Sequence, residues 1–538
     1  MRFRWGGLIL AVLIVGLLVL AGCSTTSAPG AAVSKAEDTR PTGSLTMAVN
    51  FMTGVLVDTG GKALEASGTF QSLGGAIWDS LIELNADGQV QSGIAERWDI
   101  SKDGLSHTFY IRKGVKFQNG DDLTGADVKF SLDGALKDAV STNSTIWKAA
   151  VDSIELKDDY TVVMHMKTPQ YDLIKGIGSW EGQGAVVPKK YIEEKGWDYF
   201  AKNPIGSGPW KVVSFQANAR LELEAVESHW RAVPKFKNIS LVKVNEEATR
   251  VAMLKTGELD TASDISPDSI AALKAAGLRI YGHYGSAQWY GVPFWDMENP
   301  TKYAFNDVRV RKAMSLAIDR KEVADKIYGG YAQPSALFYA PKTAYFFDAN
   351  VIKPDPYDPE QAKKLLAEAG FASGFTTKIW DTGGGSVIST ANQALSGYWR
   401  KLGINAEVSA IDYATLLKKW IPKQIPDMWP TVFAYQSPGG VLNFERMVTA
   451  YHSTKGSMKN INNPKLDELI DKVPATLDPT EKKKLALEAA VLAKSETTVI
   501  AGVDVDTLFA LGSKVGTISP VKGTTGLARA YETITHAK

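Results

Sequence analysis

The side chains that most often carry chemistry in proteins are few and scattered in this chain. No two histidines stand close enough in sequence to form a metal pair on one helix, and H-E-x-x-H, G-x-S-x-G, a Walker A loop and G-x-G-x-x-G are absent. We therefore expect no catalytic residue, no metal and no cofactor, although distant histidines could still assemble a zinc site. The six histidines are His107, His165, His229, His283, His452 and His536.

Two acidic pairs and one glycine-rich segment are the other candidates for chemistry. Asp121-Asp122 and Asp158-Asp159 stand among turn-forming residues, which favours solvated loop carboxylates. The segment "DTGGGS" (381–386) is not followed by Gly-Lys-Ser/Thr, so the pattern predicts a loop and not a phosphate site. A chain of this size without a recognisable catalytic set points to binding.

The single cysteine, Cys23, closes a segment with the order of a secretory signal. Arg2 and Arg4 precede an uncharged apolar run over 5–22. Residues 20–23, Leu-Ala-Gly-Cys, resemble the lipobox of bacterial lipoproteins, which implies a lipid on Cys23 that anchors the exported chain to a membrane. The alternative is an uncleaved membrane helix, because the run nearly reaches the ~20 residues needed to span. Both interpretations place the rest of the chain outside the cytoplasm.

Bulk composition is that of an ordinary globular protein. The chain has 538 residues, a net charge of +1 and 44% hydrophobic residues. This length suggests about three domain-sized units, and the balanced charge gives no reason to expect nucleic acid as a partner. One cysteine excludes internal disulfides. Fourteen tryptophans stand out.

Two kinds of periodicity alternate along the chain after a Ser/Thr/Ala/Gly/Pro-rich stretch that ends at residue 43. Apolar residues at every second position predict strands over 44–50, 106–117, 153–166, 208–215 and 220–226. Helical spacing predicts helices over 124–138, 358–371, 462–473 and 478–494. The mixture indicates an α/β protein with more than one lobe.

Two of the predicted helices carry clear end signals. Thr124 with Asp127 three residues later approaches a capping box. Asp358 is placed to cap the next helix, with Pro359 at its first position and Gly370 at its end.

Several motifs in a fixed order resemble the family 5 extracellular solute-binding proteins, the peptide and nickel receptors of ABC importers. The strongest is "DVRVRKAMSLAIDRKEVADKIYGGYAQP", which is similar to that family's V-R-x-A-x-x-x-A-I-D-R. Within it, Asp319 and Arg320 look like a helix end held by a salt bridge. Gly206 and Gly208 in "NPIGSGPWKV" are expected to supply backbone freedom for a sharp turn. The matching segments are 104–132, 203–212, 227–239, 307–334, 357–371 and 462–471.

The resemblance implies the two-lobed, type II-like fold of periplasmic binding proteins, an α/β fold with an extra subdomain in lobe I and the ligand held in a cleft between the lobes. The chain is expected to cross between the lobes near His283 and Asp504. The implied division is a signal peptide over 1–22, a lipid-anchored linker over 23–43, lobe I over 44–83, 205–283 and 506–538, the extra subdomain over 84–204, and lobe II over 284–505.

The ligand residues are expected in lobe II. Trp98 and Trp230 fall within scaffold motifs and are expected in the core, whereas a tryptophan near the cleft can stack on a ligand or pack in the core. In peptide-binding members a W-x-x-D-Y-x-D-P stretch supplies an aspartate for the ligand's α-ammonium, but here Phe433 and Gln436 occupy the tryptophan and aspartate positions. The candidate ligand residues are Trp289, Trp295, Trp420, Trp429, Phe433, Tyr435, Gln436 and Asn443.

The function implied is a monomeric substrate-binding lipoprotein that captures a small polar solute and delivers it to a membrane permease and its ATPase by closing its lobes. A short peptide is the class that the family implies. The missing aspartate and the tryptophan count favour an oligosaccharide as the alternative, and nickel is disfavoured because no histidine cluster is visible. An exported enzyme and a ligand-sensing receptor are the alternatives from other classes. The location is the outer face of the cytoplasmic membrane or the periplasm.

Overall fold

The computed structural model describes residues 40–49, 75–84, 90–137, 150–170, 184–294, 303–338, 345–381, 386–411, 431–438, 462–519 and 531–538, together with short pieces between them. These residues belong to one unit that spans 40–538.

An 11-stranded mixed sheet runs through the described part of the chain. Its strand order is β15-β14-β16-β12-β17-β11-β1-β10-β9-β8, and β13 pairs with β17 beside this path. Strand β1 runs parallel to β10 and β11, whereas β12 is antiparallel to both of its neighbours. The strands are β1 (Thr42–Val49), β8 (Trp210–Gln216), β9 (Arg220–Ala225), β10 (Phe236–Lys243), β11 (Thr261–Ala262), β12 (Arg279–Phe294), β13 (Ala332–Pro334), β14 (Thr376–Asp381), β15 (Asn405–Ala410), β16 (Thr431–Pro438) and β17 (Ile500–Leu511).

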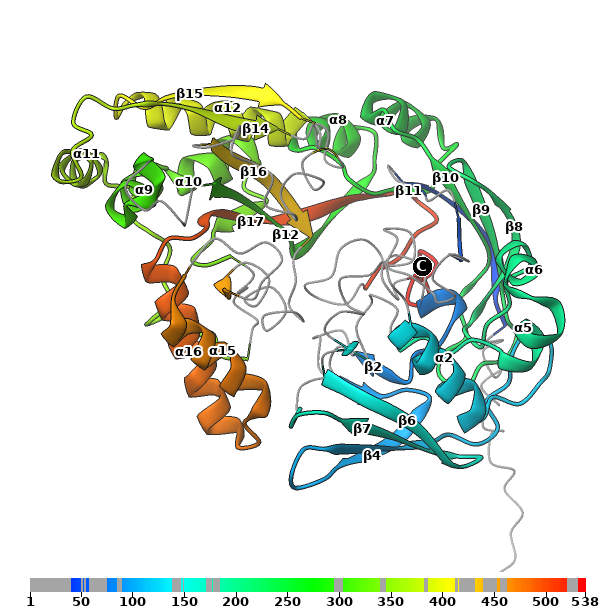
Figure 1. The fold of residues 1–538 in the computed structure, drawn as a ribbon. Coiled ribbons are helices and arrows are strands. Elements are labelled where there is room, and N and C mark those ends of the chain that lie inside the picture. Colours follow the sequence, from blue (N-terminus) through cyan, green and yellow to red (C-terminus); the bar gives the residue numbers. More distant parts are fainter. Residues whose placement is uncertain are drawn as a thin grey trace, which may run out of the picture. The chain divides into compact units, whose positions relative to one another are not determined.

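Strands β12 and β17 pair with each other over most of their length and form a long two-stranded ribbon within the sheet, between β16 and β11. Residues 279–283 pair with 507–511, and residues 287–291 pair with 500–505. The register shifts between His283 and Ala287, where β12 holds extra residues. Such a bulge bends the bulged strand and increases its local twist. Figure 1 shows the two strands side by side, with β16 continuing the sheet from β12.

A smaller antiparallel sheet has its own core. Its order is β4-β5-β7-β6, and helix α2 (Gly125–Lys137) packs against β6 and β7. Phe109, Val128, Val162 and Met164 are buried in this cluster, and partly buried Trp98 and Trp230 pack against it, as expected. A short two-stranded sheet precedes it. The strands are β2 (Ile82–Leu84), β3 (Val90–Ser92), β4 (Ala95–Ile100), β5 (Ser106–Ile111), β6 (Val151–Asp158) and β7 (Thr161–Met166).

Helices cover the main sheet at both ends of its strand order, and their buried faces build separate clusters. One cluster joins β1 and β8–β10 to α5 and α6, and another holds β12, β14, β17, α9, α11 and α12. Helices α15 and α16 pack on each other in a further cluster. The remaining helices are α5 (Lys189–Lys195), α6 (Trp197–Lys202), α7 (Glu247–Thr256), α8 (Pro267–Ala275), α9 (Val308–Leu316), α10 (Arg320–Glu322), α11 (Pro359–Glu368), α12 (Ser386–Arg400), α15 (Pro464–Ala475) and α16 (Pro479–Ser495), with short turns η1 (Ala304–Asn306) and η2 (Val323–Ile327).

The predicted helix ends are confirmed, and two predicted strands are corrected. The strand predicted over 106–117 ends at Ile111, because Lys113 and Gly114 form a turn. The Asp358 carboxylate accepts the backbone N–H of Gln361 (2.9 Å), and Gly370 has a φ of 86°. The segment 153–166 forms the hairpin β6–β7 and not one strand, because the polar sequence at Asp159 and Tyr160 makes a turn.

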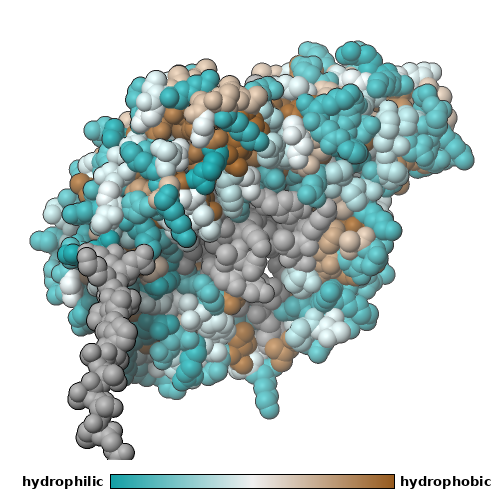
Figure 2. Space-filling view, turned by 180° about the vertical axis from the view of Figure 1, so that it is seen from behind, coloured by the Kyte–Doolittle hydropathy of each residue, from teal (hydrophilic) through white to brown (hydrophobic). Residues whose placement is uncertain are grey.

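Exposed apolar side chains are dispersed. Figure 2 shows one face, on which hydrophilic residues predominate and hydrophobic residues lie in smaller groups between them. Among the described residues the most exposed large apolar side chains are Val213, at 61%, and Leu477, at 58%. Single exposed apolar residues are normal on a protein surface, so this face suggests no docking patch.

Candidate functional site

Three of the predicted ligand residues lie on β16, the neighbour of β12. In the β12–β16 ladder Gln436 stands opposite Trp289, and Tyr435 stands opposite Tyr290. Phe433 lies two positions before Tyr435 on the same strand. The fold therefore brings two distant segments that were selected from sequence onto adjacent strands.

Trp289 is packed inside the cluster under β12, β14 and β17. Its side chain is 1% exposed, and its indole N–H donates to Oδ1 of Asn392 (3.0 Å). A Cβ added to Gly502 on β17 would lie 2.2 Å from ring atom Cε3, so the indole covers this glycine closely. This placement favours the packing role that the sequence left open for Trp289.

The other predicted site residues lie outside the described residues. These are Trp295, Trp420, Trp429 and Asn443, together with the lipidation candidate Cys23.

A buried amide that sequence reasoning missed connects the two strands of the ribbon. The Gln288 amide N–H₂ donates to Oδ1 of Asp504 (2.7 Å), to the Ser335 hydroxyl (2.6 Å) and to the carbonyl of Leu337 (3.0 Å). Gln288 and Asp504 are 4% and 7% exposed. The sequence does indicate this role, since Gln288 is a polar residue in the apolar segment "QWYGVPF" and a buried polar residue must find hydrogen-bond partners.

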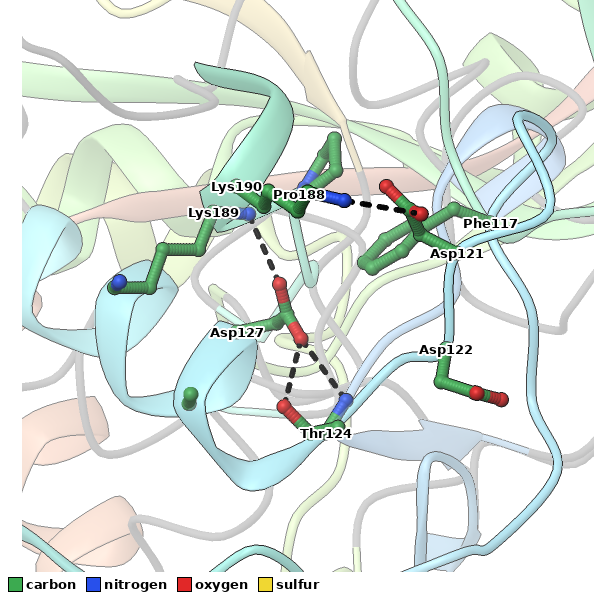
Figure 3. Close-up of a pocket in the computed structure, with 9 residues that line it drawn as sticks. Phe117, Asp121, Asp122, Thr124, Asp127, Pro188, Lys189 and Lys190 are labelled. Carbon is green, nitrogen blue, oxygen red and sulfur yellow. Dashed lines mark hydrogen bonds and ion pairs between the residues drawn. The ribbon is translucent and has the colours of Figure 1, made fainter. Parts of the chain in front are cut away.

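A cavity of about 260 Å³ lies where α2 and α5 begin (Figure 3). The Asp127 carboxylate accepts the backbone N–H and the hydroxyl of Thr124 (2.9 and 3.0 Å), which confirms the predicted helix start, and it also accepts the backbone N–H of Lys189 (2.9 Å). Lys190 forms an ion pair with Asp121 (3.6 Å). These groups already partner one another, and the cavity is below the ~300–1,000 Å³ of typical ligand pockets. We therefore interpret it as a packing gap where helices α2 and α5 meet. Its lining is Phe117, Asp121, Asp122, Thr124, Ala126, Asp127, Pro188, Lys189 and Lys190.

The segment 205–210 packs directly on the backbone of residues 76–77. A Cβ on Gly206 would lie 1.9 Å from the carbonyl oxygen of Ile77, and one on Gly208 would lie 2.5 Å from that of Ala76. Neither glycine is among the residues with a positive φ. Close backbone approach, and not the conformational freedom expected from the sequence, therefore explains these glycines.

A buried carboxylate fastens the same region. Asp79 is 0% exposed, and its oxygens lie 3.1 Å from Nε2 of His229, 2.9 Å from the Trp230 indole N–H and 3.0 Å from Nη2 of Arg231. Burial raises the pKa of Asp79, but the hydrogen bond from His229 and the charge of Arg231 outweigh it and lower the pKa to about 2. Arg231 also pairs with Glu532 near the C-terminus. The network therefore joins three distant parts of the chain.

Asp319 and Arg320 do not form the salt bridge predicted for them. The Asp319 carboxylate caps α10 by accepting the backbone N–H of Glu322 (2.9 Å). The Arg320 side chain turns into the core, where it donates to the carbonyls of Ala501 (2.8 Å) and Ser315 (3.0 Å). Both residues therefore have the structural role expected for them, but each acts through its own partners.

The comparisons with known proteins decide the family. The sequence model described as "Bacterial extracellular solute-binding proteins, family 5 Middle" matches residues 89–455, which is well over half of the chain. The chain belongs to this family. The family 5 resemblance stated from its motifs is thereby confirmed.

Curated relatives are similar over part of their length. The glutathione-binding protein GsiB of Salmonella choleraesuis (strain SC-B67) is 30% identical over 345 residues, which cover 64% of this chain and 65% of that protein. GsiB of Escherichia coli O157:H7 is 29% identical over 347 residues, with the same coverage of each chain. The match thus spans less than two thirds of these relatives.

Solved structures share the fold along nearly the whole chain. NikA of Brucella suis in complex with Fe(III)-EDTA aligns with a TM-score of 0.78 and 21% identity over 92% of this chain and 100% of NikA. DppA of Helicobacter pylori in complex with the peptide STSA aligns with a TM-score of 0.74 and 21% identity over 93% and 99%. The predicted fold class, the two-lobed α/β fold of periplasmic binding proteins, is confirmed.

Two further observations concern only the part of the chain that is described. No helix there is long and apolar enough to cross a membrane. No group of three or more histidine, cysteine, aspartate or glutamate side chains there could hold a metal ion.

Proposed function

We propose that this protein is the substrate-binding component of an ABC importer and captures a small polar solute outside the cytoplasmic membrane. The family match over residues 89–455 carries the proposal. A separate permease and ATPase would be its partners, and it would act as a monomer. No reaction is assigned to it, because the family model that it matches is one of solute-binding proteins.

We propose the lobe division predicted from sequence, with one adjusted boundary. Buried residues of β1, β8–β10 and the C-terminal segment share one cluster, and those of β12 and β14 share another, which supports lobes I and II. Ile192 of α5 and Phe200 of α6 pack with the first cluster. We therefore place the end of the extra subdomain near residue 186 and assign α5 and α6 to lobe I.

The β12–β17 ribbon is the proposed hinge. It pairs with β11 on one side and β16 on the other, so any movement of one lobe against the other must pass through it. The register shift after His283 is a local irregularity at the first predicted crossing. The Gln288–Asp504 hydrogen bond ties the two strands together beside it. A ligand that binds the closed state better than the open one would shift the population toward closure.

A short peptide is the proposed ligand class. Relatives named for glutathione and a structural neighbour solved with a peptide favour it over an oligosaccharide. Screening the domain that begins at residue 24 by thermal shift against dipeptides, tripeptides including glutathione, and oligosaccharides tests the class. A saturating ligand at 100 times its Kd adds about 2.7 kcal/mol to stability. Stabilisation by sugars alone would overturn the peptide class, and conversion of any ligand into a product would overturn the receptor function.

Gln436→Asp is expected to weaken binding of the natural ligand about tenfold or more. Gln436 stands where peptide-binding members carry an aspartate, so we infer that the ligand group beside it is neutral. A carboxylate enclosed there without a cation would bear an uncompensated desolvation cost of several kcal/mol. Calorimetry on the wild type and the variant measures the change. Tighter binding by the variant, with a requirement for a free amino group on the ligand, would contradict the neutral partner.

Cys23→Ala is expected to leave an uncleaved precursor without lipid. In the proposed lipoprotein the Cys23 sulfur accepts the lipid, and several acyl chains hold the protein at about 0.8 kcal/mol per buried CH₂. Mass spectrometry of the membrane fraction distinguishes precursor from lipidated product. Normal cleavage and anchoring of the variant would show that Cys23 is not the anchor.

A further inference from the structure

Three cationic side chains contact Asp355, two of them at its carboxylate and one at its backbone carbonyl. Oδ1 of Asp355 lies 2.7 Å from Nζ of Lys312 and 3.0 Å from Nζ of Lys494. Its Oδ2 accepts the Ser315 hydroxyl (2.6 Å). Arg320 approaches from the other side, with Nη1 3.3 Å from the Asp355 carbonyl oxygen. The Asp355 side chain is 10% exposed, whereas those of Lys494 and Lys312 are 23% and 35% exposed, so water screens the carboxylate weakly and the lysines in part.

Positive charge is in excess within this group. Arg320, Lys312 and Lys494 carry three positive charges against the single negative charge of Asp355. Burial lowers the pKa of Arg320 to about 10, with Asp355 as the only opposing charge that acts on it. The neighbouring Arg311 has its own carboxylate, that of Glu496, at 3.9 Å. Among the residues that the structure describes, the group therefore holds two more positive charges than carboxylates.

Arg320 retains a free donor among the described residues. Its Nε donates to the carbonyl of Ala501, its Nη1 to the carbonyls of Ser315, Ile318 and Asp355, and its Nη2 to the Ser315 hydroxyl (2.7 Å). A guanidinium has five N–H groups, so one N–H of Nη2 remains. Lys494 likewise uses two of its three N–H groups, on Asp355 and on the carbonyl of Ala336.

Both side chains line a small cavity. Its volume is about 10 Å³, the space that a single water-sized particle needs. Arg320 is 3% exposed and Ser335 is 1% exposed, so the cavity has buried polar walls. Its full lining is Arg320, Ser335, Ala336, Leu337, Asp355, Lys494, Thr497, Val499 and Ala501.

We propose that this cavity, here called the Arg320 cavity, is a structural binding site for one small monovalent anion of the halide class. The two unbalanced positive charges and the remaining N–H groups of Arg320 and Lys494 call for a particle that accepts hydrogen bonds and carries negative charge. A halide meets both needs, whereas water meets only the first. The anion would tie β17 to α16 and to the segment around Asp355. This site is independent of the solute-binding function.

Bromide locates the site directly. Crystals of the domain that begins at residue 24, grown in sodium bromide, should show an anomalous difference peak inside the Arg320 cavity, within hydrogen-bond reach of Arg320 Nη2 and Lys494 Nζ. A cavity that holds only water, or a peak that appears at surface lysines and not in the cavity, would overturn the proposal.

Solution measurements show whether the site is occupied at ordinary salt. The unfolding temperature of the wild type should be higher in about 150 mM sodium chloride than in the same concentration of sodium gluconate, which matches ionic strength. Lys494→Met should remove most of this difference. Lys484→Met, on the exposed part of the same helix with a 68% exposed side chain, should retain it. An equal chloride effect in all three proteins would mean that chloride acts by screening surface charges, and it would overturn the proposal. If Lys494→Met does not fold, the wild-type comparison and the bromide peak decide the question.

Discussion

Gly206→Ala is expected to destabilise the protein by about 3 kcal/mol. The added Cβ would lie 1.9 Å from the carbonyl oxygen of Ile77 and 2.7 Å from its carbon, both of them backbone atoms that no rotamer change can move. The displacement would also strain the bond from the Gly208 N–H to the Ile77 carbonyl (2.9 Å). Gln118, which accepts the Gly206 N–H with its side chain and donates to its carbonyl with its own N–H, would lose its alignment.

The midpoint of urea unfolding measures this effect, and Gly397→Ala is the matched control. Gly397 lies within α12, and a Cβ there would meet nothing within 4 Å. Alanine favours a helix over glycine by roughly 1 kcal/mol, so the control variant should be more stable than the wild type. A Gly206→Ala protein as stable as the wild type would show that close backbone approach is not the reason for this glycine.

Asp79→Asn is expected to cost about 3–5 kcal/mol, the range for breaking a buried ion pair. The carboxylate receives hydrogen bonds from Trp230 and Arg231 and contacts His229. An amide offers one acceptor in place of two oxygens and turns its own N–H₂ toward donors. The matched control is Asp99→Asn, because Asp99 is 66% exposed and pairs with Arg97 at 3.5 Å. An exposed pair contributes about 0–1 kcal/mol, so a comparable loss in both variants would contradict the network.

Acid should narrow the difference in stability between the wild type and Asp79→Asn. The pKa of Asp79 is about 2 in the folded protein and 3.8 in the reference state, so folding favours the ionised form. The corresponding stability, about 2 kcal/mol, is present above pH 3.8 and is lost as the pH falls toward 2. The gap between the urea midpoints of the two proteins should therefore be smaller at pH 3 than at pH 7, with part of it remaining. A constant gap across these pH values would mean that the ionised carboxylate is not what stabilises the Asp79 network.

Local rules predicted the helix ends and most strands correctly. Asp358 before Pro359, and Thr124 three residues before Asp127, define helix starts because the capping geometry is set within a few residues. The segment 153–166 was harder, since its alternation continues across a turn at Asp159. The extra residues in β12 after His283 likewise follow from pairing with β17, which no local pattern reveals.

Tertiary contacts decided what the motif residues do. Gly206 follows the pattern of a turn glycine, but its role depends on Ile77, more than a hundred positions away. Arg320 is adjacent to Asp319 in sequence, yet its partners are Ser315, Asp355 and Ala501. Trp289 could stack on a ligand by residue type alone, and only the position of Gly502 beneath the ring shows how it packs. The ligand role of Gln436 stays a prediction, because the structure gives only its register opposite Trp289.

Small-angle scattering of the domain that begins at residue 24, with and without its saturating ligand, tests the central claim most directly. If the protein is a receptor whose lobes close through the β12–β17 ribbon, the radius of gyration must fall when the ligand identified by thermal shift is present at saturation. A radius that stays unchanged with binding verified by calorimetry in the same sample would contradict capture by hinge closure.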